Sequence, residues 1–307
     1  MRIITTILFA TLALAGPAFA ADTYFVDGTG HKVEYGLNAK RIVSLAPSVT
    51  EMLFFLGLGD RVVGRSNYCN YPPEATKLPS VGGFVDTSIE KIVSLQPDLV
   101  VAYQGNSLEV VGQLRQLKIN VIAMPEAGSV SEVSDQMDVL RAVTYRNKPL
   151  GGGPPYPNNQ QLLWARQLDE LKATDKDQGP NVFYGMPGEV TYSAAPGSFI
   201  DDLITLAGGR NVIPSGKQRW PQVNAEFILA AQPEWLLIST PCAGHTELKK
   251  ASDDILASLA KDPVWSKLPA VKKGQIVVID ADVLLRPGPR ILDALEQLTN
   301  ALSSGNQ

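Results

Sequence analysis

A repeated segment constrains the fold of this chain more than any other feature of its sequence. Ser88–Asp98 reads SIEKIVSLQPD and Asn224–Glu234 reads NAEFILAAQPE, so an apolar helical pattern ends in Gln-Pro-acid twice. The two copies align without a gap, and each leads into a short apolar run, at Leu99–Ala102 or Trp235–Ile238. Two copies in the same order predict two related lobes, each with helices alternating with strands.

The alternation is clearest in the first half of the chain. Apolar strands are expected at Arg41–Ala46, Arg61–Arg65 and Asn120–Met124. A helix is expected over Thr50–Leu56 and begins in a capping box, in which Ser48 caps the helix and Glu51 reaches back to it. Strands and helices joined by short connections indicate parallel sheets covered by helices, which is an α/β fold.

The first residues have the pattern of a secretory signal peptide. An apolar run, Ile3–Leu14, is followed by Ala18-Phe19-Ala20, which predicts cleavage before Ala21. No cysteine lies near that point to carry a lipid, so we expect an unanchored protein in the periplasm of a Gram-negative cell. The expected division of the chain is signal peptide 1–20, N-terminal extension 21–40, N-terminal lobe 41–128, interlobe helical segment 129–178 with a Gly/Pro-rich insert, and C-terminal lobe 179–307.

Composition and motifs argue against several classes of function. A hydrophobic content of 45% favours a folded globular chain, and a net charge of −4 argues against binding nucleic acid. The two histidines have no metal-ligand spacing, and no nucleophile elbow or phosphate-binding loop occurs, so no metal, cofactor or catalytic residue is expected. Cys69 or Cys242 with His245 could form a nucleophilic pair, which leaves an exported enzyme as an alternative. A disulfide between Cys69 and Cys242, or two buried thiols, is a simpler expectation in an oxidising compartment.

Aromatic side chains occur in several loops that follow the predicted strands. Tyr68, Tyr71, Phe84, Tyr192 and Trp220 are all in such loops. Ligands of α/β proteins gather at the carboxyl ends of the strands, and aromatic faces bury a large area at a small cost in entropy. These loops therefore predict a cleft for a large, flat or amphipathic ligand.

Five motifs occur in a characteristic order: RIVSLAPSVTE, NYCNYPPEA, VGGFVDTSIEKIVSLQPDLVVA, RWPQVNAEFILAAQPEWLLI and LLRPGPRI. Over about residues 41–303 the chain resembles the helical-backbone (class III) periplasmic substrate-binding proteins of ABC importers. Within that family it is most similar to the cobalamin (vitamin B12) binding members. The resemblance implies two Rossmann-like α/β lobes with central parallel sheets, a long interlobe helix, and a ligand cleft between the lobes.

The resemblance also implies a function. The protein would be a monomer without a cofactor that captures cobalamin or a related corrinoid and delivers it to a membrane permease dimer with a cytoplasmic ATPase. Glu90 and Glu226, one from each copy of the repeat, would dock on the permease. The implied ligand-binding residues are Tyr68, Phe84, Tyr103, Tyr192, Trp220, Asp282 and Arg286.

The chain departs from this family pattern in ways that leave alternatives open. The cobalamin binders carry tryptophan at the positions of Phe84, Tyr103 and Val283, so less stacking area is available here. A haem or ferric-siderophore binder of the same class is the alternative, and a static envelope protein without a small ligand is another. In a haem binder Tyr68, Tyr71, Tyr103 and Tyr192 could ligate iron, and Arg286 with Arg290 could pair with carboxylates.

The segment that connects the lobes departs from the pattern as well. Lys148–Asn159 is rich in glycine and proline. Proline inside a helix costs ~3 kcal/mol, so we expect the connecting helix to be shortened to about Asn159–Thr174.

Overall fold

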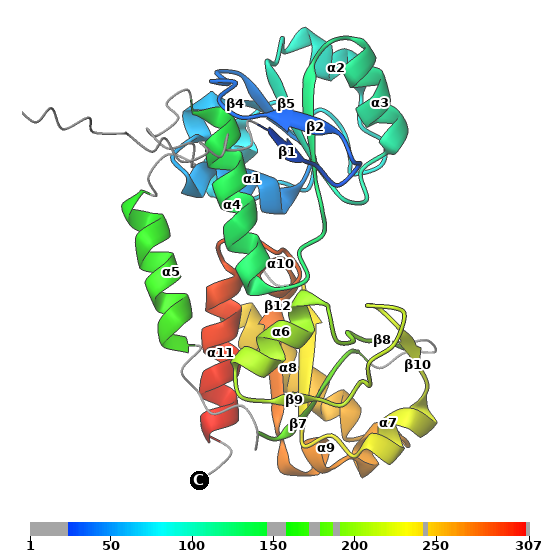
Figure 1. The fold of residues 1–307 in the computed structure, drawn as a ribbon. Coiled ribbons are helices and arrows are strands. Elements are labelled where there is room, and N and C mark those ends of the chain that lie inside the picture. Colours follow the sequence, from blue (N-terminus) through cyan, green and yellow to red (C-terminus); the bar gives the residue numbers. More distant parts are fainter. Residues whose placement is uncertain (1–23, 146–157, 172–178, 187–190, 242–244, 305–307) are drawn as a thin grey trace, which may run out of the picture.

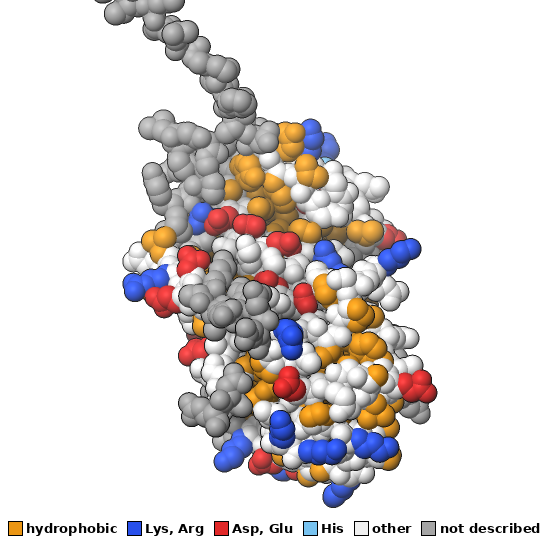
Figure 2. Space-filling model, turned by 60° about the horizontal axis from the view of Figure 1, so that its bottom comes forward, with side chains coloured by type: hydrophobic (Ala, Val, Ile, Leu, Met, Phe, Trp, Pro, Cys, Tyr) orange, Lys and Arg blue, Asp and Glu red, His pale blue; other side chains and the backbone are white. Residues whose placement is uncertain are grey.

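The computed structural model describes residues 24–145, 158–171, 179–186, 191–241 and 245–304. Within these ranges the chain forms two α/β lobes, one above the other in Figure 1, each built on a four-stranded sheet. No helix in the described part of the chain is long and apolar enough to cross a membrane. Figure 2 shows acidic and basic side chains interspersed over the face that it presents. That face therefore lacks the single-sign charge typical of a nucleic-acid-binding surface.

The N-terminal lobe has the strand order β4-β3-β5-β6, and all of its strand pairs are parallel. Its central strands are apolar and buried, as expected for a sheet covered on both faces. The elements are β3 (Ile42–Ser44), α1 (Pro47–Phe55), η1 (Gly59–Arg61), β4 (Val62–Arg65), η2 (Pro73–Lys77), α2 (Ile89–Ser94), β5 (Leu99–Tyr103), α3 (Leu108–Gln116) and β6 (Asn120–Met124).

The C-terminal lobe has the strand order β12-β11-β7-β9, again with parallel pairs. A short antiparallel ribbon of β8 (Thr191–Tyr192) and β10 (Gln222–Val223) lies beside it. The other elements are β7 (Asn181–Tyr184), α6 (Phe199–Leu206), β9 (Arg210–Asn211), α7 (Ala225–Ala231), β11 (Trp235–Thr240), α8 (His245–Leu259), η3 (Trp265–Lys267), α9 (Pro269–Lys273), β12 (Ile276–Asp280), α10 (Ala281–Leu284) and α11 (Ile291–Ser304).

The two sheets share one topology, which confirms the two related lobes that the repeat predicts. In each lobe the second strand along the chain lies at one edge, followed by the first, third and fourth strands. The repeated segments form α2 and α7, which are capped in the same way by the side chains of Ser88 and Asn224. After each helix a glutamine, Gln96 or Gln232, takes a left-handed conformation with φ of 48° or 44°. The chain is thereby turned into the next strand in both copies.

One apolar core runs through both lobes. Its buried members include Met52 of α1, Val133 of α4 (Val130–Thr144), Trp164 of α5 (Asn159–Leu171), Leu203 of α6 and Leu295 of α11. Domains move relative to each other unless the interface between them is large and hydrophobic. The shared core therefore favours a small hinge motion between the lobes.

The segment that connects the lobes contains two helices, α4 and α5. Helix α4 ends at Thr144 and α5 begins at Asn159, where the shortened helix was expected to begin. The Gly/Pro-rich insert between them lies outside the described residues, apart from its last positions. The two helices are joined by a hydrogen bond of 2.7 Å from Arg141 Nη1 to Gln161 Oε1. In Figure 1, α5 lies beside α4 and α11 at the junction of the lobes.

The start of α1 corrects one expectation. The helix follows Ala46, with Pro47 in its first turn, and no side chain caps it. The predicted capping box is wrong because Ser48 is buried inside the helix and the carboxylate of Glu51 is turned towards the C-terminal lobe. Proline at this position supplies the fixed φ that begins the helix without a capping side chain.

The N-terminal extension folds onto the first lobe as a hairpin of β1 (Tyr24–Val26) and β2 (Lys32–Glu34). Asp27 attaches the hairpin to the lobe. Its side chain is fully buried and pairs with Arg115 at 2.5 Å. The carboxylate also accepts hydrogen bonds from Thr29, His31 and, at 3.0 Å, the backbone N–H of Ala123 in β6. One carboxylate therefore holds the hairpin, α3 and the sheet together.

Asp27→Asn should destabilise the protein by roughly 2–4 kcal/mol, because it removes a buried carboxylate and leaves the half-buried Arg115 without that counter-ion. Burial acts to raise the pKa of Asp27, but hydrogen bonds from Thr29, Ala123 and His31 outweigh it and lower that pKa. The stability from this carboxylate is therefore complete above the unfolded pKa of about 3.9 and is lost as the pH falls through the folded value.

Thermal melts from pH 2.5 to 7 measure this effect. The melting temperature of Asp27→Asn should fall less steeply at acid pH than that of the wild type. The control Asp254→Asn, which changes an exposed residue, should behave like the wild type. An equally steep fall for Asp27→Asn and the wild type would show that Asp27 does not supply this stability.

Candidate ligand-binding site between the lobes

The predicted ligand-binding residues lie at the carboxyl ends of the strands or in the loops that follow them. Parallel strands end at the same edge of a sheet, so these positions are where an α/β protein binds its ligand. Tyr68 and Phe84 lie after β4, Tyr103 ends β5, Tyr192 lies in β8, Trp220 precedes β10, and Asp282 and Arg286 follow β12.

The adjacent residues Glu126 and Ala127 each bind an aromatic side chain, one from each lobe. Trp220 of the C-terminal lobe donates from Nε1 to Glu126 Oε1 at 2.9 Å, and Arg219 lies 3.8 Å from the same carboxylate. Tyr103 of the N-terminal lobe accepts the backbone N–H of Ala127 at 3.0 Å on its hydroxyl. Burial, together with the nearby charge of Glu126, raises the pKa of Tyr103 to about 12. The phenol is therefore neutral at any physiological pH.

A second contact, to an aromatic ring, also fixes the indole of Trp220. It packs edge-to-face on Phe199 of α6, with ring centroids 6.0 Å apart and an interplanar angle of 64°. Such a pair is worth roughly 0.5–1.5 kcal/mol beyond the area that it buries. The indole is therefore fixed before a ligand arrives.

Phe84 is fixed to the end of β5 by Asn106, a buried residue that the sequence analysis did not single out. The Asn106 side chain donates to the carbonyl oxygen of Phe84 at 2.7 Å and accepts the backbone N–H of Tyr103 at 2.8 Å. The ring of Phe84 crosses Gly105, where a Cβ atom would lie 2.8 Å from the ring. Gly105 also has φ of 97°, which favours glycine. The segment Tyr103–Asn106 therefore sets the place of two predicted ligand contacts.

A polar cluster joins the lobes at a second point. Asp282 Oδ2 accepts from Asn70 Nδ2 at 2.7 Å, and Asp282 Oδ1 lies 2.5 Å from Arg286 Nη2. Arg286 Nη1 donates to Asn70 Oδ1 at 2.6 Å, and Nη2 donates to the carbonyl oxygen of Tyr68 at 3.4 Å. The structure thus brings the predicted residues Tyr68, Asp282 and Arg286 together. It adds Asn70, which lies two positions after Tyr68 in the same sequence motif.

Two predicted aromatic residues keep their side chains open to solvent. Tyr68 is 60% exposed and Tyr192 is 58% exposed. The hydroxyl of Tyr192 accepts a hydrogen bond from Gln222 in the neighbouring strand β10. Large exposed aromatic surface is typical of a binding site, and here it is available on both lobes.

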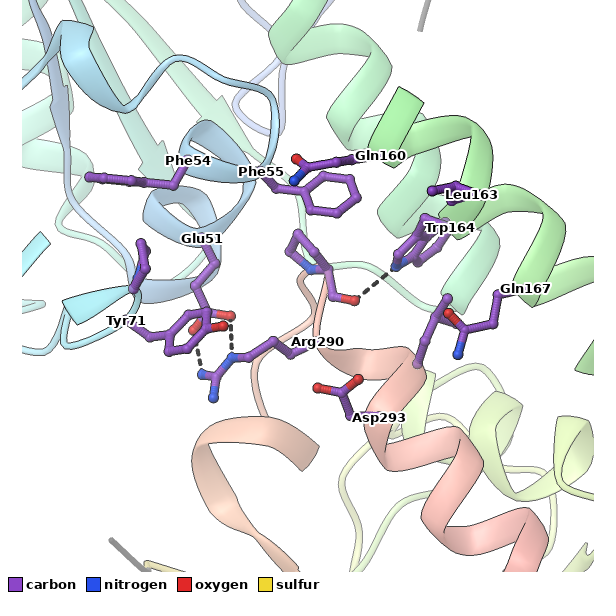
Figure 3. A pocket seen from close by; sticks show the side chains of 13 residues that line it. Glu51, Phe54, Phe55, Tyr71, Gln160, Leu163, Trp164, Gln167, Arg290 and Asp293 are labelled. Atoms are coloured by element: carbon purple, nitrogen blue, oxygen red, sulfur yellow. Dashed lines mark hydrogen bonds and ion pairs between the residues drawn. The ribbon is translucent and has the colours of Figure 1, made fainter. Parts of the chain in front are cut away.

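A separate cavity of about 520 Å³ lies where α1, α5 and the start of α11 meet (Figure 3). None of the seven predicted ligand residues lines it. Two of its polar groups already have partners, because Arg290 pairs with Glu51 and Trp164 Nε1 donates to the carbonyl oxygen of Pro289 at 2.8 Å. Its lining is Glu51, Phe54, Phe55, Tyr71, Pro72, Gln160, Leu163, Trp164, Gln167, Pro289, Arg290, Leu292 and Asp293.

The two repeated glutamates occupy equivalent positions. Glu90 lies in the first turn of α2 and Glu226 in the first turn of α7, and both are exposed. Figure 1 shows α2 on the upper lobe and α7 on the lower lobe. A partner that contacts both glutamates must therefore span both lobes.

The cysteines do not support the expected disulfide or a nucleophile. Cys69 is fully buried as a free thiol, with Sγ 3.2 Å from Ser66 Oγ, so no bridge from it to Cys242 is found. Cys242 lies outside the described residues, and the side chain of His245 is not described. A thiol as buried as that of Cys69 cannot meet a substrate. The described residues also contain no group of three potential metal ligands among His, Cys, Asp and Glu.

Comparison with known proteins identifies the family. The vitamin B12-binding protein of Vibrio cholerae is 30% identical over 266 residues, which cover 86% of this chain and 89% of that protein. A crystal structure of the periplasmic vitamin B12-binding protein of Vibrio cholerae matches with a TM-score of 0.70, over 88% of this chain and 99% of that one. A periplasmic haem-binding protein from Roseiflexus sp. RS-1 is 27% identical, with a TM-score of 0.66, over 88% and 100%.

The periplasmic binding protein family model matches residues 42–146 and 165–283, which include both lobes. The chain therefore belongs to the periplasmic binding protein family, a family of binding proteins and not of enzymes.

Proposed function

We propose that this protein is the solute-binding component of an ABC importer and that it captures cobalamin or a related corrinoid between its lobes. The observation that carries the proposal is that Trp220 and Tyr103, one from each lobe, are hydrogen-bonded to the adjacent residues Glu126 and Ala127. Similarity to proteins named for binding vitamin B12 supports the choice of ligand. A ligand that contacts both rings is enclosed by both lobes at once.

The chemistry of the site suits a large ring that carries amide groups. Phe84, Tyr103 and Trp220 offer aromatic faces for the apolar ring surface. Asn70, Asp282 and Arg286 offer donors and acceptors for the amide side chains around it. Tyr68 and Tyr192 are exposed on opposite lobes and can add contacts at the edges.

Trp220→Ala should weaken cyanocobalamin binding roughly 10- to 100-fold, because it removes a large apolar face worth about 1.5–3 kcal/mol. Trp220→Phe is the matched control, because it keeps a ring but loses the hydrogen bond to Glu126. Calorimetric titration of wild type and both variants measures the effect, with thermal melts to confirm folding. Equal affinity for wild type and Trp220→Ala would show that the ligand does not use this face.

A haem ligand is the second candidate, favoured by the similarity to a haem-binding protein of the same fold. Iron ligation by tyrosine requires the phenolate form. Tyr103 is a poor source of phenolate because burial raises its pKa to about 12, which leaves the exposed Tyr68, Tyr71 and Tyr192 for that role.

The state of Tyr103 can be measured without a ligand. The absorbance change at 295 nm between pH 7 and pH 11 counts the tyrosines that ionise in this range. Tyr103→Phe should lose almost none of this change relative to the wild type, because burial raises the pKa of Tyr103 to about 12, above this range. A loss equal to the amplitude of one tyrosine would return Tyr103 to the list of iron ligands.

The proposed partner is a membrane permease dimer with a cytoplasmic ATPase, contacted through Glu90 and Glu226. Exposed ion pairs contribute only ~0.2–1 kcal/mol each, so these contacts would set register and association rate more than affinity. Their equivalent placement on α2 and α7 supports a partner with two equivalent halves.

The double variant Glu90→Gln/Glu226→Gln should weaken association with the purified permease complex about 3- to 20-fold at low salt, with a smaller loss at high salt. Surface plasmon resonance measures the association rate. Glu296→Gln, an exposed glutamate on α11, is the control. Unchanged association of the double variant would remove both glutamates from the docking surface.

We further propose that the protein is exported by its signal peptide and is free in the periplasm rather than lipid-anchored. The family is periplasmic, and the signal Ala18-Phe19-Ala20 has no cysteine beside it. N-terminal sequencing of the exported protein tests this, because cleavage at the proposed site leaves Ala21 first.

A further inference from the structure

Glu51 is a buried carboxylate that the proposed binding site does not use directly. It lies on α1 in the N-terminal lobe, and its side chain is only 2% exposed. Burying a charge costs several kcal/mol unless it is well partnered. The structure shows the partners: both are arginines of the other lobe.

The first partner is Arg290. It donates from Nε to Glu51 Oε2 at 2.8 Å and from Nη2 to Glu51 Oε1 at 2.6 Å, which is the two-pronged geometry of a strong pair. Its guanidinium also lies over the ring of Tyr71, 4.1 Å from the centroid, and donates to the carbonyl oxygen of Asp282 at 3.0 Å. Figure 3 shows the dashed contacts from Arg290 to Glu51, with the ring of Tyr71 next to them. Burial acts to lower the pKa of Arg290, but Glu51, together with Tyr71 and Asp282, outweighs burial and raises that pKa.

The second partner is Arg286, a proposed ligand contact. Its Nη1 donates to Glu51 Oε1 at 3.3 Å, so one carboxylate oxygen is shared by both arginines. With Asn70, Tyr68 and Asp282 as the other acceptors, both terminal nitrogens of Arg286 are held by described residues. For Nε–H, no hydrogen bond to the described part of the chain is present. The guanidinium is therefore fixed in orientation, with one donor left.

The sequence between the arginines explains why both reach one carboxylate. They flank Pro287-Gly288-Pro289, and each proline fixes φ near −65°. Gly288 passes close to α1, where a Cβ atom would lie 3.6 Å from the carbonyl oxygen of Ser48 and 3.7 Å from Glu51 Oε2. The short link has little conformational freedom, so its two arginines keep a set spacing over Glu51.

We propose that Glu51 is a positioning residue for ligand binding: from the N-terminal lobe it holds Arg286 directly, and the backbone of Asp282 through Arg290, in the orientation that meets the ligand. The proposal rests on the proposed function, because Arg286 and Asp282 are its ligand contacts. Without the Glu51 charge, Arg286 keeps its ion pair with Asp282 of its own lobe, and the neutral groups of Asn70 and Tyr68 remain as its contacts to the N-terminal lobe. The orientation of Arg286 is then fixed less firmly by the arrangement of the lobes.

The test uses cyanocobalamin affinity and one measurement that needs no ligand. Glu51→Gln keeps the size of the side chain and removes its charge, and should weaken cyanocobalamin binding about 10-fold by calorimetry. In the double variant Glu51→Gln/Arg286→Gln, affinity should match Arg286→Gln alone within about threefold, because the two residues act through the same guanidinium. Glu109→Gln, an exposed glutamate on α3, is the matched control.

The second measurement is the rate at which phenylglyoxal modifies Arg286, read by peptide mass spectrometry on the ligand-free protein. Glu51→Gln should raise this rate at least about threefold, whereas Arg166, whose side chain is 78% exposed, should react equally in both proteins.

The outcomes separate this proposal from the proposed function. Unchanged Arg286 modification in Glu51→Gln overturns the positioning role, whatever the ligand. Unchanged cyanocobalamin affinity in Glu51→Gln overturns it too, because a purely structural ion pair would alter only the melting temperature. If wild type does not bind cyanocobalamin, the proposed ligand fails and the modification rate alone decides the role of Glu51.

Discussion

The continuous apolar core that α4, α5 and α11 share with both lobes is the constraint on which the rest of the structure depends. Because Trp164 and Leu168 of α5 are buried in it, the lobes are packed on common helices rather than joined by a flexible linker. Close-packed protein interiors have low compressibility and transmit strain, so they resist continuous deformation. The facing loops of the two lobes therefore meet in one arrangement, and a ligand site divided between them can be formed in advance.

Two interlobe contacts depend on that arrangement and differ in chemistry. At one, Trp220 meets Glu126 beside Tyr103, which places aromatic surface from both lobes together. At the other, Glu51 binds the two arginines that flank a Pro-Gly-Pro link. The first suits the apolar face of a large ring and the second suits its polar edge. A binding protein with both can recognise an amphipathic ligand and orient it.

The sequence predicts the fold well because its signal is repeated. The copies at Ser88 and Asn224 place equivalent helices before equivalent strands, and both sheets have the same strand order. The sequence failed where a residue's partner is distant along the chain. Glu51 fits a capping box with its neighbour Ser48, yet its carboxylate binds Arg290, 239 positions away. Asn106 and Glu126 were missed for the same reason, since a polar residue after a strand has no pattern of its own. The resemblance to a family, rather than periodicity, supplied Asp282 and Arg286.

The central claim is that the ligand lies between Tyr103 and Trp220 and not in the cavity beside α5. A crystal structure of the protein grown with cyanocobalamin tests it most directly. The account predicts a corrin ring in contact with both side chains, with Arg286 still hydrogen-bonded to Glu51. A ligand found instead against Phe54, Phe55 and Trp164 in the cavity of Figure 3 would contradict it.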